Sequence, residues 1–341
     1  MPELKLAIDA MGGDNGPSVV IEALKNSLKQ DTTTQFVVVG DEAILSSLFS
    51  QFELSDHPQV TLVHAEQVVE MTDKPGATMR QKPQSSMRVA LDMHAHGEVD
   101  GVVSGGNTGA LMAQAYFILK PIPGVLRPAL MAALPNMTGG RSYLLDLGAN
   151  PSCDSETLFQ FGVMGSVAAR VLESDKNVSV ALLNMGEEEL KGNDEVRNAA
   201  QLLGQSEHVN YIGFIEGNHL FSGRADVIVC DGFVGNIALK SCEGLATLII
   251  DELKASLTSH WLYSWFFKFL QKRTKKSWQR LKPDHYNGAS LIGLRGVVVK
   301  SHGSANATAF ESAISHAIKE ASHRLPEKIQ DRVESVLLEQ H

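Results

Sequence analysis

The sequence predicts an α/β fold in which a mostly parallel sheet is covered by helices. Short apolar runs rich in β-branched residues alternate with amphipathic stretches of helical period along most of the chain. Most apolar runs are followed by a glycine-containing loop and then a helix, an order typical of parallel sheets. With 341 residues, of which 43% are hydrophobic, the chain can bury a large core.

The alternation begins with a strand at residues 4–9, a helix at 18–29, a strand at 36–39 and a helix at 42–52. Further strands are predicted near residues 60–63, 101–104, 130–134, 143–146, 178–183, 227–230 and 297–300. The pattern spans residues 1–341 without a repeat or a low-complexity linker. We therefore interpret the chain as one α/β domain, either undivided or in two lobes.

Charge and cysteine content narrow the function classes. The net charge of −9 disfavours general nucleic-acid binding, which depends on phosphate neutralisation by Lys and Arg. The three cysteines are scattered and form no C-x-x-C pair, which fits a reducing compartment. The first residues lack a secretory pattern, and no stretch approaches about 20 apolar residues. We expect a cytoplasmic protein.

The loops that follow the predicted strands carry the chemistry. In open α/β sheets, ligands bind outside the carboxyl ends of the strands, where loops lead into helix N-termini. Here these loops are poor in positive charge and rich in Gly, Asn, Ser and Thr, residues that bind anions through amides and hydroxyls. The loops span residues 9–17, 104–109, 146–150, 184–193, 231–236 and 301–306.

Three loops supply individual candidates. Gly106, Asn107 and Thr108 could hold a phosphate at the start of helix 108–120, although simple helix capping is an equal alternative. Lys191 follows three glutamates and could be a solvated salt-bridge partner or a site residue. His302 could donate to an anion or move a proton, or could instead cap or pack.

Several familiar chemistries lack their motifs. The sequence contains no G-x-G-x-x-G after a strand, no P-loop, no G-x-S-x-G and no H-E-x-x-H. Cys230 and Cys242 are interpreted as small hydrophobic residues, and Cys153 has no partner histidine in the sequence. We therefore assign neither a metal ligand nor a cysteine nucleophile.

Seven short segments of the sequence are informative as a set. Each is weak alone, but they occur in order from about Leu6 to past Asn306. They are Ile8-Asp-Ala-Met-Gly-Gly-Asp14, Ser104-Gly-Gly-Asn-Thr-Gly-Ala110, Arg127-Pro128, Leu145-Asp-Leu-Gly-Ala-Asn150, Gly186-Glu-Glu-Glu-Leu-Lys-Gly192, Cys230-Asp-Gly-Phe-Val-Gly-Asn236 and Lys300-Ser-His-Gly-Ser-Ala-Asn306. Together, these segments resemble the bacterial phosphate acyltransferase family of phospholipid synthesis.

The resemblance implies a catalytic domain with a three-layer α/β/α fold similar to isopropylmalate dehydrogenases and phosphotransacetylases. It also implies a homodimer without a cofactor or metal that moves a fatty acyl group from acyl carrier protein to inorganic phosphate. The membrane glycerol-3-phosphate acyltransferase is then a further candidate partner. One departure from the family pattern, Pro151-Ser152, weakens any role for Cys153.

For this reaction we expect Gly106, Asn107, Thr108 and Lys191 to hold phosphate. Candidates to stabilise the oxyanion or protonate the leaving thiolate are Asn236, His302 and Asn306, with Lys191 also counted as catalytic. Asp9, Asp14 and Asp231 are expected to orient these donors. Two alternatives stay open: a metal- and NAD-dependent decarboxylating dehydrogenase of similar fold, and a non-enzymatic membrane scaffold.

Residues 256–286 form a predicted amphipathic, basic and aromatic tip. All three tryptophans lie there, and Trp261, Trp265, Phe266 and Phe269 recur at helical spacing. Seven basic residues and no acidic one fall between Thr258 and Pro283, which is typical of a helix attracted to anionic lipid. We expect the tip to attach the protein peripherally to the inner face of the membrane, with subunit packing or carrier-protein docking as alternatives.

Overall fold

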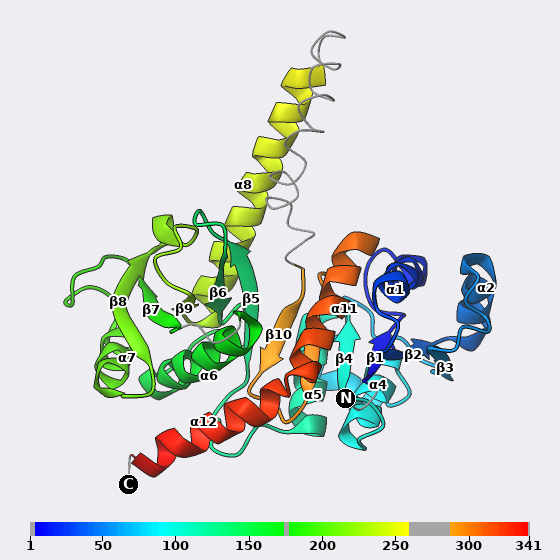
Figure 1. The fold of residues 1–341 in the computed structure, drawn as a ribbon, viewed down its shortest axis with the longest axis horizontal. Helices are drawn as coiled ribbons and strands as arrows, with labels where there is room; N and C mark the ends of the chain where they lie inside the picture. Colours follow the sequence, from blue (N-terminus) through cyan, green and yellow to red (C-terminus); the bar gives the residue numbers. More distant parts are fainter. Residues whose placement is uncertain (1–3, 174–176, 259–286, 340–341) are drawn as a thin grey trace.

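A computed structural model describes residues 4–173, 177–258 and 287–339. Its strands form one eleven-stranded sheet in the order β3-β2-β1-β4-β11-β10-β5-β6-β9-β7-β8. Figure 1 shows this sheet passing through both lobes of the molecule, with helices packed against it. The predicted α/β class with a mostly parallel sheet is confirmed.

Nine of the eleven described strands begin and end close to the predicted residues. The described strands are β1 (Lys5–Asp9), β2 (Gln35–Gly40), β3 (Val60–His64), β4 (Gly101–Ser104), β5 (Ala129–Pro135), β6 (Arg141–Leu145), β7 (Ser179–Asn184), β8 (Asn210–Glu216), β9 (Val227–Val229), β10 (Ala289–Ile292) and β11 (Val297–Lys300).

The helices follow the same alternation. They are α1 (Pro17–Gln30), α2 (Glu42–Phe52), α3 (Pro75–Gln81), α4 (Ser86–Ala95), α5 (Thr108–Leu119), α6 (Ser155–Glu173), α7 (Asp194–Gln205), α8 (Gly232–Thr258), α11 (Ala307–Ser322) and α12 (Leu325–Glu339), with a short 3₁₀ turn at Gly217–His219.

Alternating side chains along the strands produce three layers. In β1, Leu6 and Ile8 join a buried cluster with α1, α2 and α11, whereas Ala7 joins the cluster of α4 and α5 on the other face. In β6, Tyr143 and Leu145 pack with α6, α7 and α12. This separation follows from the period of two in a strand. It gives the α/β/α arrangement.

Two strands lie where the sequence pattern predicted none. β10 pairs antiparallel with both β11 and β5, and β5 pairs antiparallel with β6. β8 is an edge strand that lacks strict apolar alternation and contains Gly213 at positive φ. The antiparallel strands join two parallel groups, β3-β2-β1-β4-β11 and β6-β9-β7-β8, into a single sheet.

Helix α8 rises from the body between the two lobes (Figure 1). Its Gly232–Glu252 segment has a mean hydropathy of 1.4 and only 6% of it is buried, so by length and composition it could span a membrane. The expectation that no such stretch exists was wrong. Between Gly232 and Asp251 the charged residues are Lys240 and Glu243, so the segment is apolar on average despite its polar residues. Length and composition alone do not establish a span.

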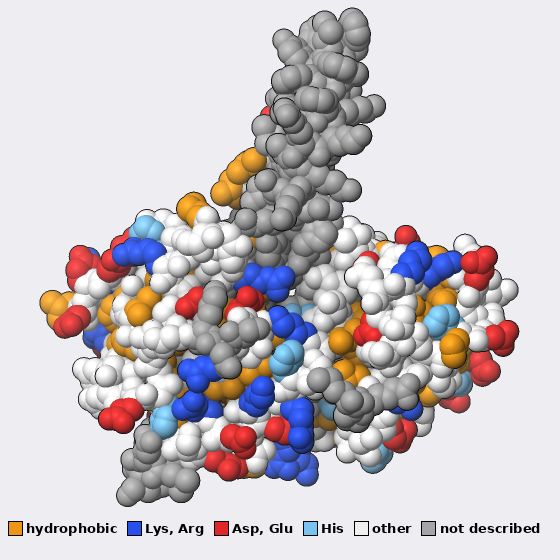
Figure 2. All heavy atoms as spheres, in the orientation of Figure 1, with side chains coloured by type: hydrophobic (Ala, Val, Ile, Leu, Met, Phe, Trp, Pro, Cys, Tyr) orange, Lys and Arg blue, Asp and Glu red, His pale blue; other side chains and the backbone are white. Residues whose placement is uncertain are grey.

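The described part of α8 presents an apolar surface. Orange side chains are visible beside the lower part of the projecting region in Figure 2. The exposed large apolar residues of this helix are Phe233, Val234, Ile237, Leu245, Leu248 and Ile249. The predicted tip residues Trp261, Trp265, Phe266 and Phe269 lie outside the described residues, so their membrane contact stays a prediction.

Candidate functional site

Three polar residues end three neighbouring strands in one row. Asp9 of β1 is the register partner of Ser104 of β4, and Ser104 is the register partner of Lys300 of β11. All three side chains are buried, with Lys300 only 6% exposed. Because the three strands are parallel, their carboxyl ends and the loops that follow meet at one edge of the sheet.

Asp9 is the acceptor at the centre of this edge. Its carboxylate accepts hydrogen bonds from the hydroxyl of Ser86 at 2.7 Å and from that of Ser104 at 2.6 Å. Complete burial raises the pKa of Asp9, and the two serine hydrogen bonds oppose that shift. Ser86 is the first residue of α4, so the positive end of the helix dipole faces the carboxylate.

The peptide between Gly105 and Gly106 is held from both sides. The Gly106 amide donates to the Ser104 hydroxyl at 3.1 Å, and the Gly105 carbonyl accepts from the Lys300 ammonium at 3.3 Å. A side chain on Gly12 would come within 2.6 Å of the Gly106 nitrogen. The two hydrogen bonds therefore fix the orientation of the Gly105–Gly106 peptide. Only glycine fits at position 12, where the loop after β1 crosses the loop after β4.

Asn107 uses its side chain inside the protein. Its Oδ1 caps α5 by accepting from the Ala110 amide at 3.0 Å, and its Nδ2 donates to the carbonyls of Met71 at 2.9 Å and Asp73 at 3.1 Å. Thr108, the first residue of α5, is half-buried beside it. Of the two weighed roles, the capping role of Asn107 is present; phosphate binding by Asn107 and Thr108 stays a prediction.

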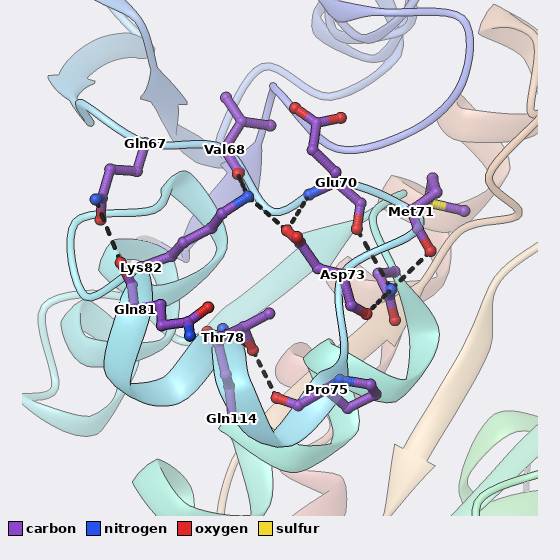
Figure 3. A network of polar contacts seen from close by, with 11 residues as sticks. Gln67, Val68, Glu70, Met71, Asp73, Pro75, Thr78, Gln81, Lys82 and Gln114 are labelled. Carbon is purple, nitrogen blue, oxygen red and sulfur yellow. Dashed lines mark hydrogen bonds and ion pairs between the residues drawn. The ribbon is translucent and has the colours of Figure 1, made fainter.

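The segment that Asn107 holds has its own polar network (Figure 3). Lys82 forms a 2.5 Å ion pair with Asp73 and donates to the Val68 carbonyl, while Asp73 also accepts from the Glu70 amide. The hydrogen bond from Lys82 is the largest cause of the lowered pKa of Asp73. Met71 in this segment is 43% exposed and packs against Gly303. The segment therefore borders the loops after β4 and β11.

His302 follows β11 and contacts α8. The Lys240 ammonium lies 3.0 Å from Nε2 of His302 and 2.8 Å from the Glu243 carboxylate. An ammonium can only donate, so Nε2 accepts and a neutral ring carries its proton on Nδ1, 2.9 Å from the Ser304 hydroxyl. The longer 3.3 Å contact from the Ser304 amide to Nδ1 favours the tautomer with its proton on Nε2. That tautomer would direct the Nε2 proton at the Lys240 ammonium, which has no lone pair to accept it.

Burial and the Lys240 charge both lower the pKa of His302. Its backbone amide donates to Asn287 Oδ1 at 2.9 Å, which fixes the start of the loop. The ring is therefore neutral near pH 7 and lies beside a cation. The proton-transfer role of His302 stays a prediction.

Loops after β1 and β11 are joined directly. The Asp14 amide donates to the Gly303 carbonyl at 2.7 Å, and Asn15 Nδ2 donates to the carbonyls of Ser304 and Ala305 at 3.0 Å each. Asn306 caps α11 by accepting from the Ala309 amide at 2.9 Å. Asp14 thus supports the His302 loop through its backbone, whereas Asn306 has a structural task in addition to its predicted one.

The second half of the site surrounds Asp146. Its buried carboxylate accepts from the amides of Leu130, Ala149 and Asn150. Burial raises the pKa of Asp146, and these hydrogen bonds oppose the shift. These partners show that Asp146 organises the loop from 146 to 150.

Helix α8 begins directly against this loop. A side chain on Gly235 would overlap the Asp146 carbonyl oxygen, so only glycine permits the close approach. Asn236 packs with its Cβ 3.7 Å from the position a Gly148 side chain would take. Asp231 accepts from the Val234 amide at 2.8 Å in the first turn of the helix. Asn236 is thereby placed at the site edge, while its chemical role stays a prediction.

The cysteines near Asp146 are held as thiols. Burial and the charges of Asp146 and Asp231 raise the pKa of Cys153 to about 12, and the same causes raise that of Cys230. A thiol with so high a pKa is a poor nucleophile at neutral pH. Neither Cys153 nor Cys230 is therefore suited to act as a nucleophile.

Lys191 lies far along the sheet from the glycine loop after β4. It is exposed in the loop after β7, and its backbone carbonyl accepts from Asn184 Nδ2 at 3.1 Å. β7 lies six positions from β4 in the sheet order, which is roughly 29 Å at about 4.8 Å per step before twist. Among the described residues, no hydrogen bond joins Lys191 to Gly106, Asn107 or Thr108, so its share in phosphate binding stays a prediction.

Sequence reasoning missed three contributors: Ser104, Lys240 and Lys300. Each could be noticed as a polar residue at the end of a strand or in the first turns of a helix, but such positions are common. Their contacts depend on strands 95 and 291 residues from Asp9 lying in one row, which no local pattern reveals.

Over residues 4–173, 177–258 and 287–339, no three His, Cys, Asp or Glu residues form a metal-binding group.

Comparisons with known proteins agree with this arrangement. The family described as "Fatty acid synthesis protein" matches residues 4–328. The phosphate acyltransferase of Idiomarina loihiensis is 69% identical over 340 residues, covering 100% of both chains, and that of Shewanella sp. strain MR-4 is 50% identical over 99% of both. A solved phosphotransacetylase from Streptococcus pyogenes shares the fold, with a TM-score of 0.64, 17% identity and 94% coverage of each chain.

The matches extend over 99–100% of the chain, so the matched length includes the loops of the candidate site. The phosphotransacetylase likeness confirms the predicted fold relationship, while its low identity carries no more than the fold. The chain belongs to the phosphate acyltransferase family of enzymes of fatty acid synthesis.

Proposed function

We propose that this phosphate acyltransferase takes its fatty acyl group from the thioester of acyl carrier protein and transfers it to inorganic phosphate. The product, an acyl phosphate, would enter phospholipid synthesis. Full-length identity of 69% with a named phosphate acyltransferase carries the acyltransferase part. The choice of carrier protein as donor rests on the resemblance of the seven loop segments.

The chemistry of the described site favours direct transfer. Phosphate attacks the thioester carbonyl, a C–O bond forms, and the C–S bond breaks when the tetrahedral intermediate collapses. An acyl-cysteine intermediate would need a thiolate, yet burial and nearby carboxylates hold Cys153 and Cys230 as thiols. Phosphate is already ionised at neutral pH, so positioning can supply much of the rate acceleration.

The departing thiolate needs a proton or a cation beside it. Lys240 and His302 form the pair best suited to this task, because Lys240 carries protons and His302 is neutral at their 3.0 Å contact. Asn236 and Asn306 remain our candidates for stabilising the oxyanion. Lys191 is kept as a phosphate-binding candidate from the opposite half of the site.

A direct assay tests the proposed function. Purified protein is incubated with palmitoyl-loaded acyl carrier protein and phosphate, without nucleotide or metal, and acyl phosphate is trapped as the hydroxamate. We expect product only when phosphate is present. A requirement for NAD or a divalent metal would favour the decarboxylating dehydrogenase, and failure with every acyl donor would favour the membrane scaffold.

We further propose that the protein is a cytoplasmic homodimer bound peripherally to an anionic membrane. The exposed apolar residues of α8, such as Phe233, Ile237 and Leu248, support burial against a second copy. The basic aromatic segment that follows supports lipid contact. Multi-angle light scattering tests the dimer: a monomeric mass at assay concentrations would contradict it.

A further inference from the structure

Lys300 is a buried lysine that the reaction scheme above leaves unused. Its side chain is 6% exposed. Lys300 is the last residue of β11 before the His302 loop and belongs to the row Asp9–Ser104–Lys300. Its ammonium donates to two backbone carbonyls, those of Gly105 and Ser301. It thus joins the glycine loop after β4 to the loop after β11.

The Lys300 ammonium forms no ion pair among the described residues. Among the described residues, no carboxylate lies within 4.0 Å of its nitrogen. Asp9, the nearest buried acid in the row, is saturated by the hydroxyls of Ser86 and Ser104. The charged groups acting on Lys300 are Asp9 and Asp14 from the β1 side, which stabilise its ammonium, and Lys240 from α8, which destabilises it.

A neutral donor could satisfy two carbonyl oxygens without the cost of burying a charge. An ammonium at this position therefore adds something that hydrogen bonding to the loops does not require. It places a positive charge behind Gly105 and Gly106, at a loop whose other nearby donors are neutral. A doubly charged anion bound at this loop would gain from that charge in a site shielded from water.

Building on the proposed function, we propose that Lys300 is the positioning residue of the phosphate substrate. Its ammonium sets the Gly105–Gly106 peptide through the Gly105 carbonyl, and its charge strengthens the binding of phosphate at that loop. Lys300 acts by orienting the Gly105–Gly106 loop and through the electric field of its ammonium. It is therefore distinct from the residues that contact the thioester.

Titration supplies a readout that a purely structural lysine would not affect. Burial lowers the pKa of Lys300 to about 8. Its ammonium is present below that pH and is lost above it, so kcat/KM for phosphate should fall as pH rises through about 8. Bound phosphate stabilises the ammonium and raises its pKa, so the corresponding fall in kcat should occur at higher pH.

The experiment compares Lys300→Met with the wild type and with Lys319→Met. Lys319 is a matched control because its ammonium also donates to a backbone carbonyl, that of Leu172, at the opposite end of α11. We expect Lys300→Met to lower kcat/KM for phosphate about 10²-fold and to remove the fall near pH 8, with KM for the acyl donor unchanged. Lys319→Met should keep both the rate and the pH profile.

Phosphate binding is measured separately from turnover by the rise in melting temperature that inorganic phosphate causes. Wild type and Lys319→Met should show this rise, and Lys300→Met should lose most of it. If Lys300→Met does not fold, Lys300→Gln keeps a donor without the charge and should show the same losses. Unchanged phosphate kinetics, or a fall near pH 8 that persists without Lys300, would overturn the assignment.

The two readouts separate this inference from the proposed function. If the wild type makes no acyl phosphate but phosphate stabilises it through Lys300, the function is wrong and the anion site stands. If the wild type is active and the Lys300 variants match it in rate, pH profile and phosphate stabilisation, the site assignment is wrong and the function stands.

Discussion

The Lys240 ammonium lies 3.0 Å from Nε2 of His302, and this contact joins the two halves of the site. Lys240 belongs to α8, which starts against the Asp146 loop, while His302 follows β11 beside the glycine loop. The charge of Lys240 helps to keep the imidazole neutral. Proton transfer at the site should therefore depend on both residues.

Replacing Lys240 with Met should raise the pKa of His302, because a nearby positive charge is removed. The protonated fraction of the ring at any given pH then increases, and the acidic fall in kcat/KM moves to higher pH. NMR titration of the imidazole nitrogens measures the pKa directly. An unchanged His302 pKa together with an unchanged pH profile would contradict the coupling.

Asp9→Asn should move the alkaline fall in phosphate kcat/KM to lower pH. The Asp9 carboxylate stabilises the Lys300 ammonium, so its removal lowers the pKa of Lys300 further. Asp100→Asn is the control, since Asp100 accepts from the Lys5 amide at the opposite end of the same strands. A shift to higher pH, or equal shifts in both variants, would refute this coupling.

Asn236→Ala and Lys191→Ala should each leave a folded protein and lower turnover about 10²-fold or more, the usual scale for losing one charge-stabilising donor. His302→Ala should also slow the reaction. Steady-state rates with circular dichroism as a folding control provide the check. Near-normal rates would remove the corresponding residue from the site.

Gly235→Ala should lower stability by about 1–3 kcal/mol or more and abolish activity, because its Cβ would overlap the Asp146 carbonyl. Gly244→Ala, in the same helix, has open space around the added methyl and should stabilise by about 0.5–1 kcal/mol. Urea denaturation compares the two. Equal effects of both substitutions would show that the close approach at Gly235 is unimportant.

Wild-type protein should sediment with anionic vesicles and much less with neutral ones, since each Lys or Arg near the surface contributes roughly 1 kcal/mol. Trp265→Glu and Phe269→Glu should weaken binding by placing charge on the apolar face of the predicted tip. Wild type that remains in the supernatant with anionic vesicles would exclude the membrane proposal, whatever the enzyme assay gives.

Local sequence patterns were sufficient for most of the fold. The apolar run that ends at Ser104 and the glycines after it predicted both β4 and the start of α5, because strand period and helix capping are local properties. β10 (Ala289–Ile292) escaped prediction because it forms a strand by pairing antiparallel with β11 and β5, and local sequence does not reveal these partners. β8 escaped it because an exposed edge strand needs no regular apolar alternation.

The sequence by itself determined which segments become strands and helices, which loops carry donors, and which family the loops resemble. Only the tertiary structure decided that β11 lies beside β4, so that Lys300 reaches Gly105 and Asp9 reaches Ser104. The physical reason is that side-chain period selects the buried face of a strand, whereas backbone hydrogen bonds are alike in every strand and do not select its neighbour. The neighbours follow from packing the whole chain into one sheet.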